Sequence, residues 1–166
     1  MAVAPAVAGA HYHGVLRFIA TTPVAASAEA VFAWHEAPGA FARLTPPWER
    51  VQVVHREGGI RNGARVSLRV GPWPFSMRWD LEHRDYQHGR SFTDVQRSGP
   101  FTHWTHVHRM TPTGPDSCVL DDTIDYALPF GVLGTLAAKL FVEPKLRKMF
   151  AFRHDVTRRA FVPTPP

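Results

Sequence analysis

The feature that most constrains this fold is a series of six short strand-like segments, separated by turn residues and followed by one long helical segment. Within the strand-like segments apolar and polar residues alternate, and Gly, Pro and Asn-Gly mark the turns between them. The predicted strands cover residues 51–56, 64–70, 75–85, 90–96, 101–110 and 119–128. Because strands joined by short turns pair with their neighbours, this order predicts an antiparallel meander.

The segments on either side of the meander complete the predicted element order. Residues 13–21 alternate as a first strand, and two short helices are predicted after it, one with Ser27 as its N-cap and one over residues 40–44. After Pro129 the apolar spacing becomes helical, and Pro144 is expected to kink or restart this helix. Its apolar stripe consists of Leu133, Leu136, Ala137 and Leu140, continued by Leu146, Met149 and Phe150.

This order predicts an α+β fold in which a curved antiparallel sheet of about seven strands wraps around a long C-terminal helix. Two short helices lie between the first and second strands. The apolar stripe of the helix is expected to pack on the concave face of the sheet. Because a helix that crosses a strongly curved sheet does not fill the whole hollow, we expect a cavity for a small, largely apolar molecule.

The chain of 166 residues fits a single domain. We expect a ligand-binding domain over residues 11–161, a flexible leader at 1–10 and a flexible tail at 162–166. The only cysteine is Cys118, so no intrachain disulfide forms, which is compatible with a cytoplasmic location. No segment approaches the roughly 20 apolar residues that a membrane span needs.

The net charge of +5 comes from the C-terminal helix, where residues 139–159 contain seven basic and two acidic side chains. A basic helix face is usually solvated, and the sequence contains none of the nucleic-acid-binding motif patterns. We therefore expect no nucleic-acid partner, at most a weak contact with anionic lipid, and a monomer or homodimer.

Five short motifs stand out along the chain: Leu44-Thr45-Pro46-Pro47-Trp48, Asp94-Val95-Gln96 with Gly99-Pro100-Phe101, Trp104-Thr105-His106-Val107-His108, Asp122 through Tyr126 to Pro129, and residues 150–153. Together with the element order they resemble the START-like, helix-grip superfamily often labelled SRPBCC, which includes polyketide cyclases and lipid- or quinone-binding proteins, and more narrowly a bacterial subgroup of it. The resemblance spans residues 13–159 and implies a helix-grip fold with a cavity, whereas members of the superfamily include carriers, regulators and enzymes.

Three of the predicted strands carry a set of polar side chains. Since side chains alternate along a strand, three sets each share a face: Trp104, His106 and His108; Asp94 and Gln96; and Asp122, Ile124 and Tyr126. The sequence leaves open which face of the sheet each set occupies. If they all face the cavity, the polar groups there must pair with each other or with a ligand.

Three interpretations of this polar set are open. The first is a structural hydrogen-bond network between strands. In the second, His106 or His108 moves a proton, Asp94 or Asp122 orients the imidazole and Tyr126 donates a hydrogen bond to a bound carbonyl compound. The third is a metal site made of His-x-His and a carboxylate. The resemblance does not favour a metal, and ten histidines make chance pairs common, so no metal and no cofactor are expected.

The residues expected to line the cavity are mostly aromatic. Arg153, which falls on the apolar stripe of the last helix, is expected either to pair with a sheet carboxylate or to contact an anionic ligand group. The expected lining residues are Trp48, Phe75, Trp79, Gln96, Trp104, His106, Phe150 and Arg153.

The leading hypothesis is non-catalytic binding or carriage of a small hydrophobic ligand, such as a lipid, isoprenoid, quinone or polyketide-like compound. The alternative is an enzyme of the cyclase or dehydratase kind that uses the His/Asp/Tyr set. A third hypothesis is an interaction module whose basic helix contacts anionic membranes or protein partners.

Overall fold

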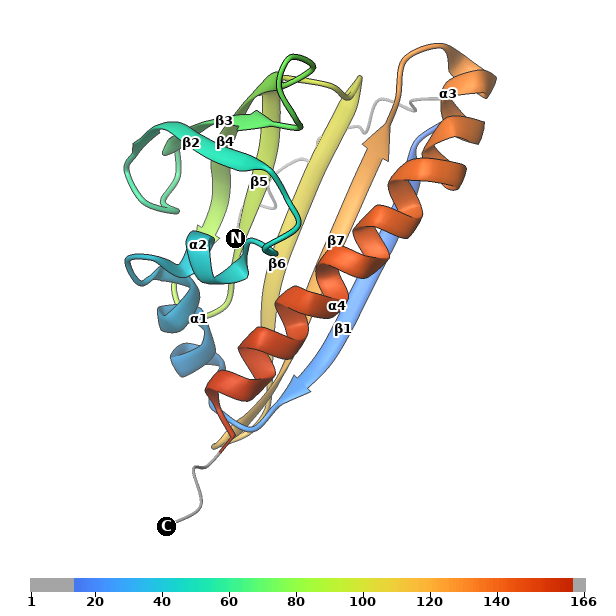
Figure 1. Cartoon of the computed structure of the whole chain (residues 1–166). Helices are drawn as coiled ribbons and strands as arrows, with labels where there is room; N and C mark the ends of the chain where they lie inside the picture. Colours follow the sequence, from blue (N-terminus) through green and yellow to red (C-terminus); the bar gives the residue numbers. More distant parts are fainter. Residues whose placement is uncertain (1–13, 163–166) are drawn as a thin grey trace, which may run out of the picture.

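The computed structural model of the chain describes residues 14–162 and contains one seven-stranded antiparallel sheet (Figure 1). The predicted leader at 1–10, and the predicted tail beyond residue 162, lie outside the described residues. In spatial order the strands are β1 (Leu16–Val24), β7 (Ser117–Ala127), β6 (His103–Gly114), β5 (Ser91–Ser98), β4 (Met77–Gln87), β3 (Arg65–Val70) and β2 (Val51–Glu57). The predicted meander is confirmed, and β1 pairs with β7 to extend it.

Two short helices connect β1 to β2, as predicted. Helix α1 (Ala28–Glu36) begins after Ser27, whose hydroxyl accepts a hydrogen bond from the Ala30 backbone amide at 3.2 Å. Helix α2 (Ala40–Leu44) follows Gly39, which has a positive φ of 81° that favours glycine. Helix α1 packs against β6 and β7, and α2 packs against the C-terminal helix.

The C-terminal helical segment lies lengthwise along β1 and β7 on one face of the sheet (Figure 1). It consists of α3 (Gly131–Ala137), a π-helical turn η1 (Ala138–Val142) and α4 (Glu143–Ala160). Pro144 lies in the first turn of α4, and the Glu143 amide donates to the Ala138 carbonyl five residues back. The irregularity at Pro144 is therefore accommodated by one widened turn, and the helical segment continues.

Two clusters of buried side chains hold these elements together. One joins the middle of the sheet to α4 and includes Phe18, Trp104, Tyr126, Leu146 and Phe150. The other lies under α1 and includes Val31, Phe32, Phe92, Met110 and Leu120. The fold is the predicted helix-grip arrangement.

One prediction about the helix was wrong. Leu133, Leu136 and Leu140 point to solvent, and the residues of this part that pack inward are Gly134 and Ala138. A side chain at Gly134 would clash with the Pro129 carbonyl, so the helix approaches the preceding segment closely on its small-residue side. The apolar stripe of α4 does face the core, through Leu146 and Phe150.

No helix among residues 14–162 is both long enough and apolar enough to cross a bilayer.

Candidate functional site

The sheet register brings the predicted polar side chains together. Asp94 of β5 stands between His83 of β4 and His106 of β6, and His108 of β6 stands opposite Asp122 of β7. All five belong to the face of the sheet that packs on α4, because α4 adds His154 to the same group. We call these six side chains the His/Asp cluster.

Asp122 accepts from histidines on two different elements. Its Oδ1 lies 2.7 Å from His106 Nε2, and its Oδ2 lies 2.8 Å from His154 Nε2. His108 Nδ1 also lies 2.7 Å from Asp122 Oδ1, but it is not aligned as a hydrogen bond. The carboxylate of Asp122 therefore ties β6 to α4 in the centre of the protein.

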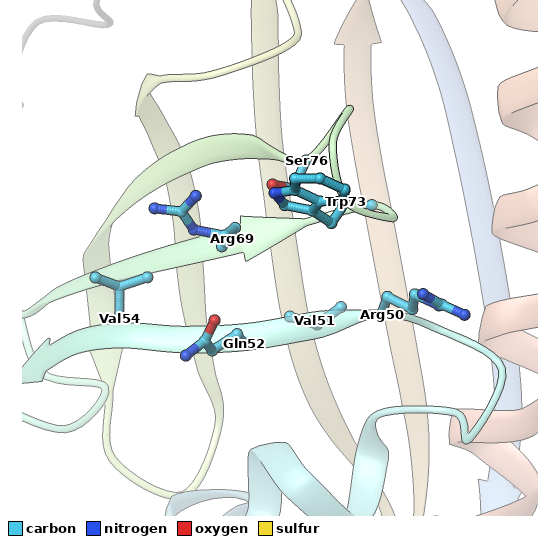
Figure 2. Close-up of a pocket in the computed structure, with 8 residues that line it drawn as sticks. Arg50, Val51, Gln52, Val54, Arg69, Trp73 and Ser76 are labelled. Carbon is cyan, nitrogen blue, oxygen red and sulfur yellow. The ribbon is translucent and has the colours of Figure 1, made fainter.

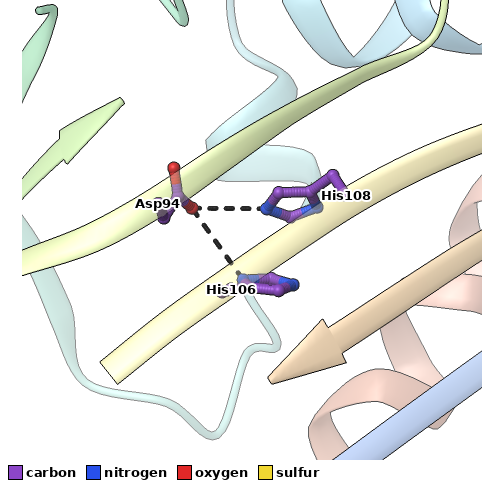
Figure 3. Close-up of side chains that lie close together, drawn as sticks. All are labelled: Asp94, His106 and His108. Atoms are coloured by element: carbon purple, nitrogen blue, oxygen red, sulfur yellow. Dashed lines mark hydrogen bonds and ion pairs between the residues drawn. The ribbon is translucent and has the colours of Figure 1, made fainter. Parts of the chain in front are cut away.

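Asp94 forms the second centre of the cluster. Its Oδ2 lies 3.3 Å from His108 Nε2 and 3.9 Å from His106 Nδ1 (Figure 3). Its Oδ1 lies 3.2 Å from His83 Nε2 without an aligned hydrogen bond. Both imidazoles of the His-x-His pair thus lie between the two carboxylates.

Aromatic rings pack directly against the cluster. Phe92 stacks on His108 with ring centroids 4.2 Å apart, and Phe150 meets His106 edge-on at 5.3 Å. His106, His108, Asp122 and His154 are all buried, whereas Asp94 keeps 17% of its side chain exposed. The surroundings are apolar enough to strengthen every charge interaction inside the cluster.

Burial and charge set the protonation of the cluster. Burial by itself would raise the pKa of Asp122, but the charge on His108 and the contacts from three imidazoles lower it well below its usual value. Burial and the nearby His108 charge lower the pKa of His106 to about 4. Burial also disfavours the His108 cation, but Asp122 and Asp94 together raise its pKa. Both imidazoles of the His-x-His pair therefore lie in the field of two carboxylates, which act against the effect of burial.

The same atoms are a candidate ligand set for a metal ion. One ligand atom from each of Asp94, His106 and His108 lies within 4.8 Å of the others. Imidazole nitrogen and carboxylate oxygen are ligands that zinc and iron accept.

A cavity of about 80 Å³ opens onto this cluster. Apolar side chains of α2, β2, β3, β4 and β5, together with Ile60, line it, and so do His83, Asp94 and His108 of the cluster. Arg153 of α4 and Arg56 of β2 also line it. The predicted cavity is present, but side chains fill most of the hollow between sheet and helix.

A larger hollow of about 570 Å³ lies at the β2–β3 edge of the sheet (Figure 2). Arg50, Gln52, Arg69 and Trp73 line it, and Trp73 is 85% exposed. Since this hollow is an open surface groove that none of the His/Asp cluster lines, we place the candidate site at the smaller cavity.

The structure places the predicted lining residues in several environments. Arg153 lines the cavity, and His106 belongs to the cluster behind it. Trp48 lies on the surface against Phe152, and Phe75 is 81% exposed in the β3–β4 loop. Trp79, Trp104 and Phe150 pack in the central core.

Tyr126 and Gln96 are buried or partly buried outside the cavity wall. Tyr126 packs beside Phe101 and Trp104, with ring centroids 6.2 Å and 6.4 Å away. Gln96 donates from Nε2 to the Phe101 carbonyl at 2.6 Å, which braces the turn between β5 and β6. A Cβ at Gly99 would clash with the Trp79 ring, so the glycine of the Gly-Pro-Phe motif leaves room for this packing.

Three histidines of the site were not singled out from the sequence. His154 is spaced four residues from Phe150 on the buried face of α4, and His83 alternates with Leu81 along β4. His35, on α1, lines the cavity, and its Nδ1 lies 2.8 Å from the Val31 carbonyl oxygen. Their spacing marks them as inward-facing, but only the register across strands shows which carboxylate each one meets.

Comparison with protein families gives a match over most of the chain. The model of the family described as polyketide cyclase/dehydrase and lipid transport matches residues 24–153. No curated protein matches the chain by sequence.

Solved structures share the fold at low sequence identity. The Zhui aromatase/cyclase from Streptomyces sp. R1128 is 20% identical, with a TM-score of 0.68 over 88% of this chain and 93% of its own. A START superfamily protein from Mycobacterium smegmatis is 20% identical, with a TM-score of 0.64 over 87% and 98%. Norcoclaurine synthase from Thalictrum flavum is 17% identical, with a TM-score of 0.65 over 96% and 98%. These similarities show a common fold.

Proposed function

The chain belongs to the polyketide cyclase/dehydrase and lipid transport family, and from that premise we propose that it binds a small, largely apolar molecule that carries a carboxylate or carbonyl oxygen. The ligand would lie in the cavity between α2, the β2–β5 part of the sheet and α4. Its apolar body would contact side chains such as Phe41, Leu44 and Leu81, which line the wall. Its oxygen would face Arg153.

The position of Arg153 is the observation that carries this proposal. The other arginines of α4 pair with acidic side chains of the same helix, Arg147 with Glu143, and Arg158 and Arg159 with Asp155. Within the described residues Arg153 has no carboxylate partner, and its guanidinium lies 5.1 Å from the centre of the Phe150 ring. A partly buried guanidinium that lines an apolar cavity is a binding group for an oxygen anion or carbonyl.

The size of the cavity adds a requirement. Ligand pockets commonly have volumes of roughly 300 to 1,000 Å³, so the space of about 80 Å³ must widen before a ligand of that class enters. Strand β2 is the natural element to move, because it is the last strand of the sheet and pairs only with β3. Most of its side chains are exposed. We expect β2 and α2 to separate from α4 on binding.

The test begins with native mass spectrometry of the full chain and of its organic extract, to find an apolar compound that copurifies. Decanoate and decanol are then titrated as matched probes with and without the carboxylate. We expect Arg153→Gln to weaken decanoate binding at least about tenfold, close to 1.4 kcal/mol, and to change decanol binding little. Arg158→Gln, on an exposed part of the same helix, is the control and should change neither.

Two results would reject this function. The first is the absence of both a copurified apolar compound and measurable decanoate binding. The second is loss of an identified turnover in His108→Gln with ligand binding retained, which would favour the alternative of a cyclase- or dehydratase-type enzyme.

A further inference from the structure

We propose that Asp94, His106 and His108 form a binding site for a divalent transition-metal ion, with one coordination position open to the cavity. This goes beyond the binding of an apolar ligand, and it gives the His/Asp cluster a chemical role of its own. The ligand atoms would be Asp94 Oδ2, His106 Nδ1 and His108 Nε2.

The spacing of these atoms is close to that of a metal site. Asp94 Oδ2 lies 3.3 Å from His108 Nε2 and 3.9 Å from His106 Nδ1 (Figure 3). Bond lengths of about 2.0 to 2.1 Å in a tetrahedral zinc site place neighbouring ligand atoms about 3.3 Å apart. The Asp94–His108 distance already fits, whereas His106 Nδ1, which lies within 4.8 Å of both other atoms, would have to move closer to complete the geometry.

Asp122 supplies the supporting contacts that histidine ligands of metals usually have. It accepts from His106 Nε2 at 2.7 Å and lies 2.7 Å from His108 Nδ1, so each ring turns its other nitrogen toward Asp94. A carboxylate behind the ligand fixes the tautomer and the orientation of the imidazole. His83 lies beside the other oxygen of Asp94, with its Nε2 3.2 Å from Oδ1.

The arrangement leaves a mismatch that a cation resolves. When neutral His106 carries its proton on Nε2 to serve Asp122, Nδ1 presents a lone pair toward the Asp94 carboxylate at 3.9 Å, too far for a hydrogen bond. Three of the four buried side-chain atoms without a hydrogen-bond partner among the described residues are His83 Nδ1, Asp94 Oδ1 and His108 Nδ1. None of these three is a proposed ligand atom, so the atom that a cation would serve directly is His106 Nδ1, whose lone pair faces Asp94 Oδ2.

Charge and access also favour a metal ion here. A divalent cation would balance the two carboxylates, Asp94 and Asp122, that this apolar interior holds together. Asp94 and His108 line the cavity, so an ion can enter and a water or a ligand oxygen can reach it. Three protein ligands and one open position are the pattern of reactive rather than purely structural zinc sites.

The test uses the full chain stripped with a chelator and titrated with Co²⁺ and Zn²⁺ in the absence of any apolar ligand, so its outcome is independent of the proposed ligand binding. We expect one ion per chain, with a Kd of roughly 1 μM or below, and the visible absorption bands of low-coordinate Co²⁺. Asp94→Asn should weaken binding by about 100-fold or more.

Two matched controls separate this site from other histidines. His55→Gln removes a surface imidazole that lies 3.5 Å from Glu57, and the pair His11→Gln and His13→Gln removes the second His-x-His of the sequence. Neither change should alter the affinity. Circular dichroism checks that each variant is folded.

The site would be rejected if the wild-type chain bound no ion stoichiometrically, or if folded Asp94→Asn retained wild-type affinity. If Asp94→Asn does not fold, the wild-type Co²⁺ spectrum decides, because six-coordinate bands would contradict a site with three protein ligands and one open position.

Discussion

Two regions of this protein reverse the usual distribution of side chains. The interior holds the His/Asp cluster, with four imidazoles and two carboxylates between the sheet and α4. The surface carries an apolar ridge, which we define as Phe130, Val132, Leu133, Leu136, Leu140 and Phe141, with exposed fractions between 55% and 85%.

The difference between the two regions shows when polar side chains can be buried and when large apolar side chains remain exposed. Polar groups are buried in the cluster because each carboxylate meets several imidazoles, which offsets the cost of desolvation. The ridge is exposed because α3 and η1 use Gly134 and Ala138 for close packing, which leaves the large side chains on the outside. Hydrophobicity alone would have placed the two sets the other way round.

The largest loss of stability is expected from a substitution where α4 contacts the His/Asp cluster. Phe150 is buried against Phe18 and His106, so Phe150→Ala leaves a cavity and exposes the cluster to water. We expect the free energy of unfolding to fall by about 4 kcal/mol, measured by urea denaturation. A loss below about 1 kcal/mol would mean that the interior relaxes freely and is not closely packed.

Removal of the central carboxylate should have the next largest effect. Asp122→Ala leaves His106, His108 and His154 without their shared acceptor, and we expect a loss of about 3 kcal/mol in the same assay. Asp125→Ala, which removes the partner of Arg17 on the outer face of the same strand, is the control and should cost much less. Equal losses of stability in Asp122→Ala and Asp125→Ala would show that the buried pairing stabilises the fold no more than the exposed ion pair does.

The pH dependence of stability should distinguish the buried histidines from the exposed ones. Burial, with the nearby charges of His108 and Arg153, lowers the pKa of His35 to about 4 from its ordinary 6.5. Between pH 6.5 and pH 4, His35 is protonated in the unfolded chain but neutral in the folded chain. The contribution of His35 to stability is therefore present above pH 6.5 and is lost as the pH falls toward 4. At pH 5 we expect His35 to account for a loss of about 2 kcal/mol relative to pH 7.

Urea denaturation at pH 7 and pH 5 checks this value, because His35→Gln should reduce the difference between the two pH values by that amount. His55→Gln, at an exposed position of β2, should leave the difference unchanged. An unaltered pH dependence in His35→Gln would contradict the expectation.

The smallest effect is expected on the ridge. Leu136 is 55% exposed, so Leu136→Ala should change the free energy of unfolding by no more than about 0.5 kcal/mol. A larger loss would show that the ridge contributes to folding although it faces solvent.

Local sequence patterns predicted most of the fold. Alternation along each strand, the turn residues and the Ser27 cap placed the elements to within a few residues, since these signals depend on the chain's own backbone. Alternation also predicted that His106 and His108 share a face, and the resemblance pointed to Asp94 and Asp122.

The pattern was misleading in the helix after Pro129. Leu133, Leu136 and Leu140 have helical spacing, but spacing does not reveal that Gly134 allows the opposite face to approach the Pro129 carbonyl. His83 and His154 were missed for a related reason, because nothing within β4 or α4 indicates that a carboxylate of another element lies opposite.

The sequence by itself determined the order of the elements, the antiparallel meander and the helix-grip class. Only the tertiary structure decided that the polar set faces α4, that the cavity is about 80 Å³, and that Arg153 has no acidic partner among the described residues. The physical reason is range: backbone periodicity is set by neighbours along the chain, whereas strand register and side-chain filling depend on residues far apart in sequence.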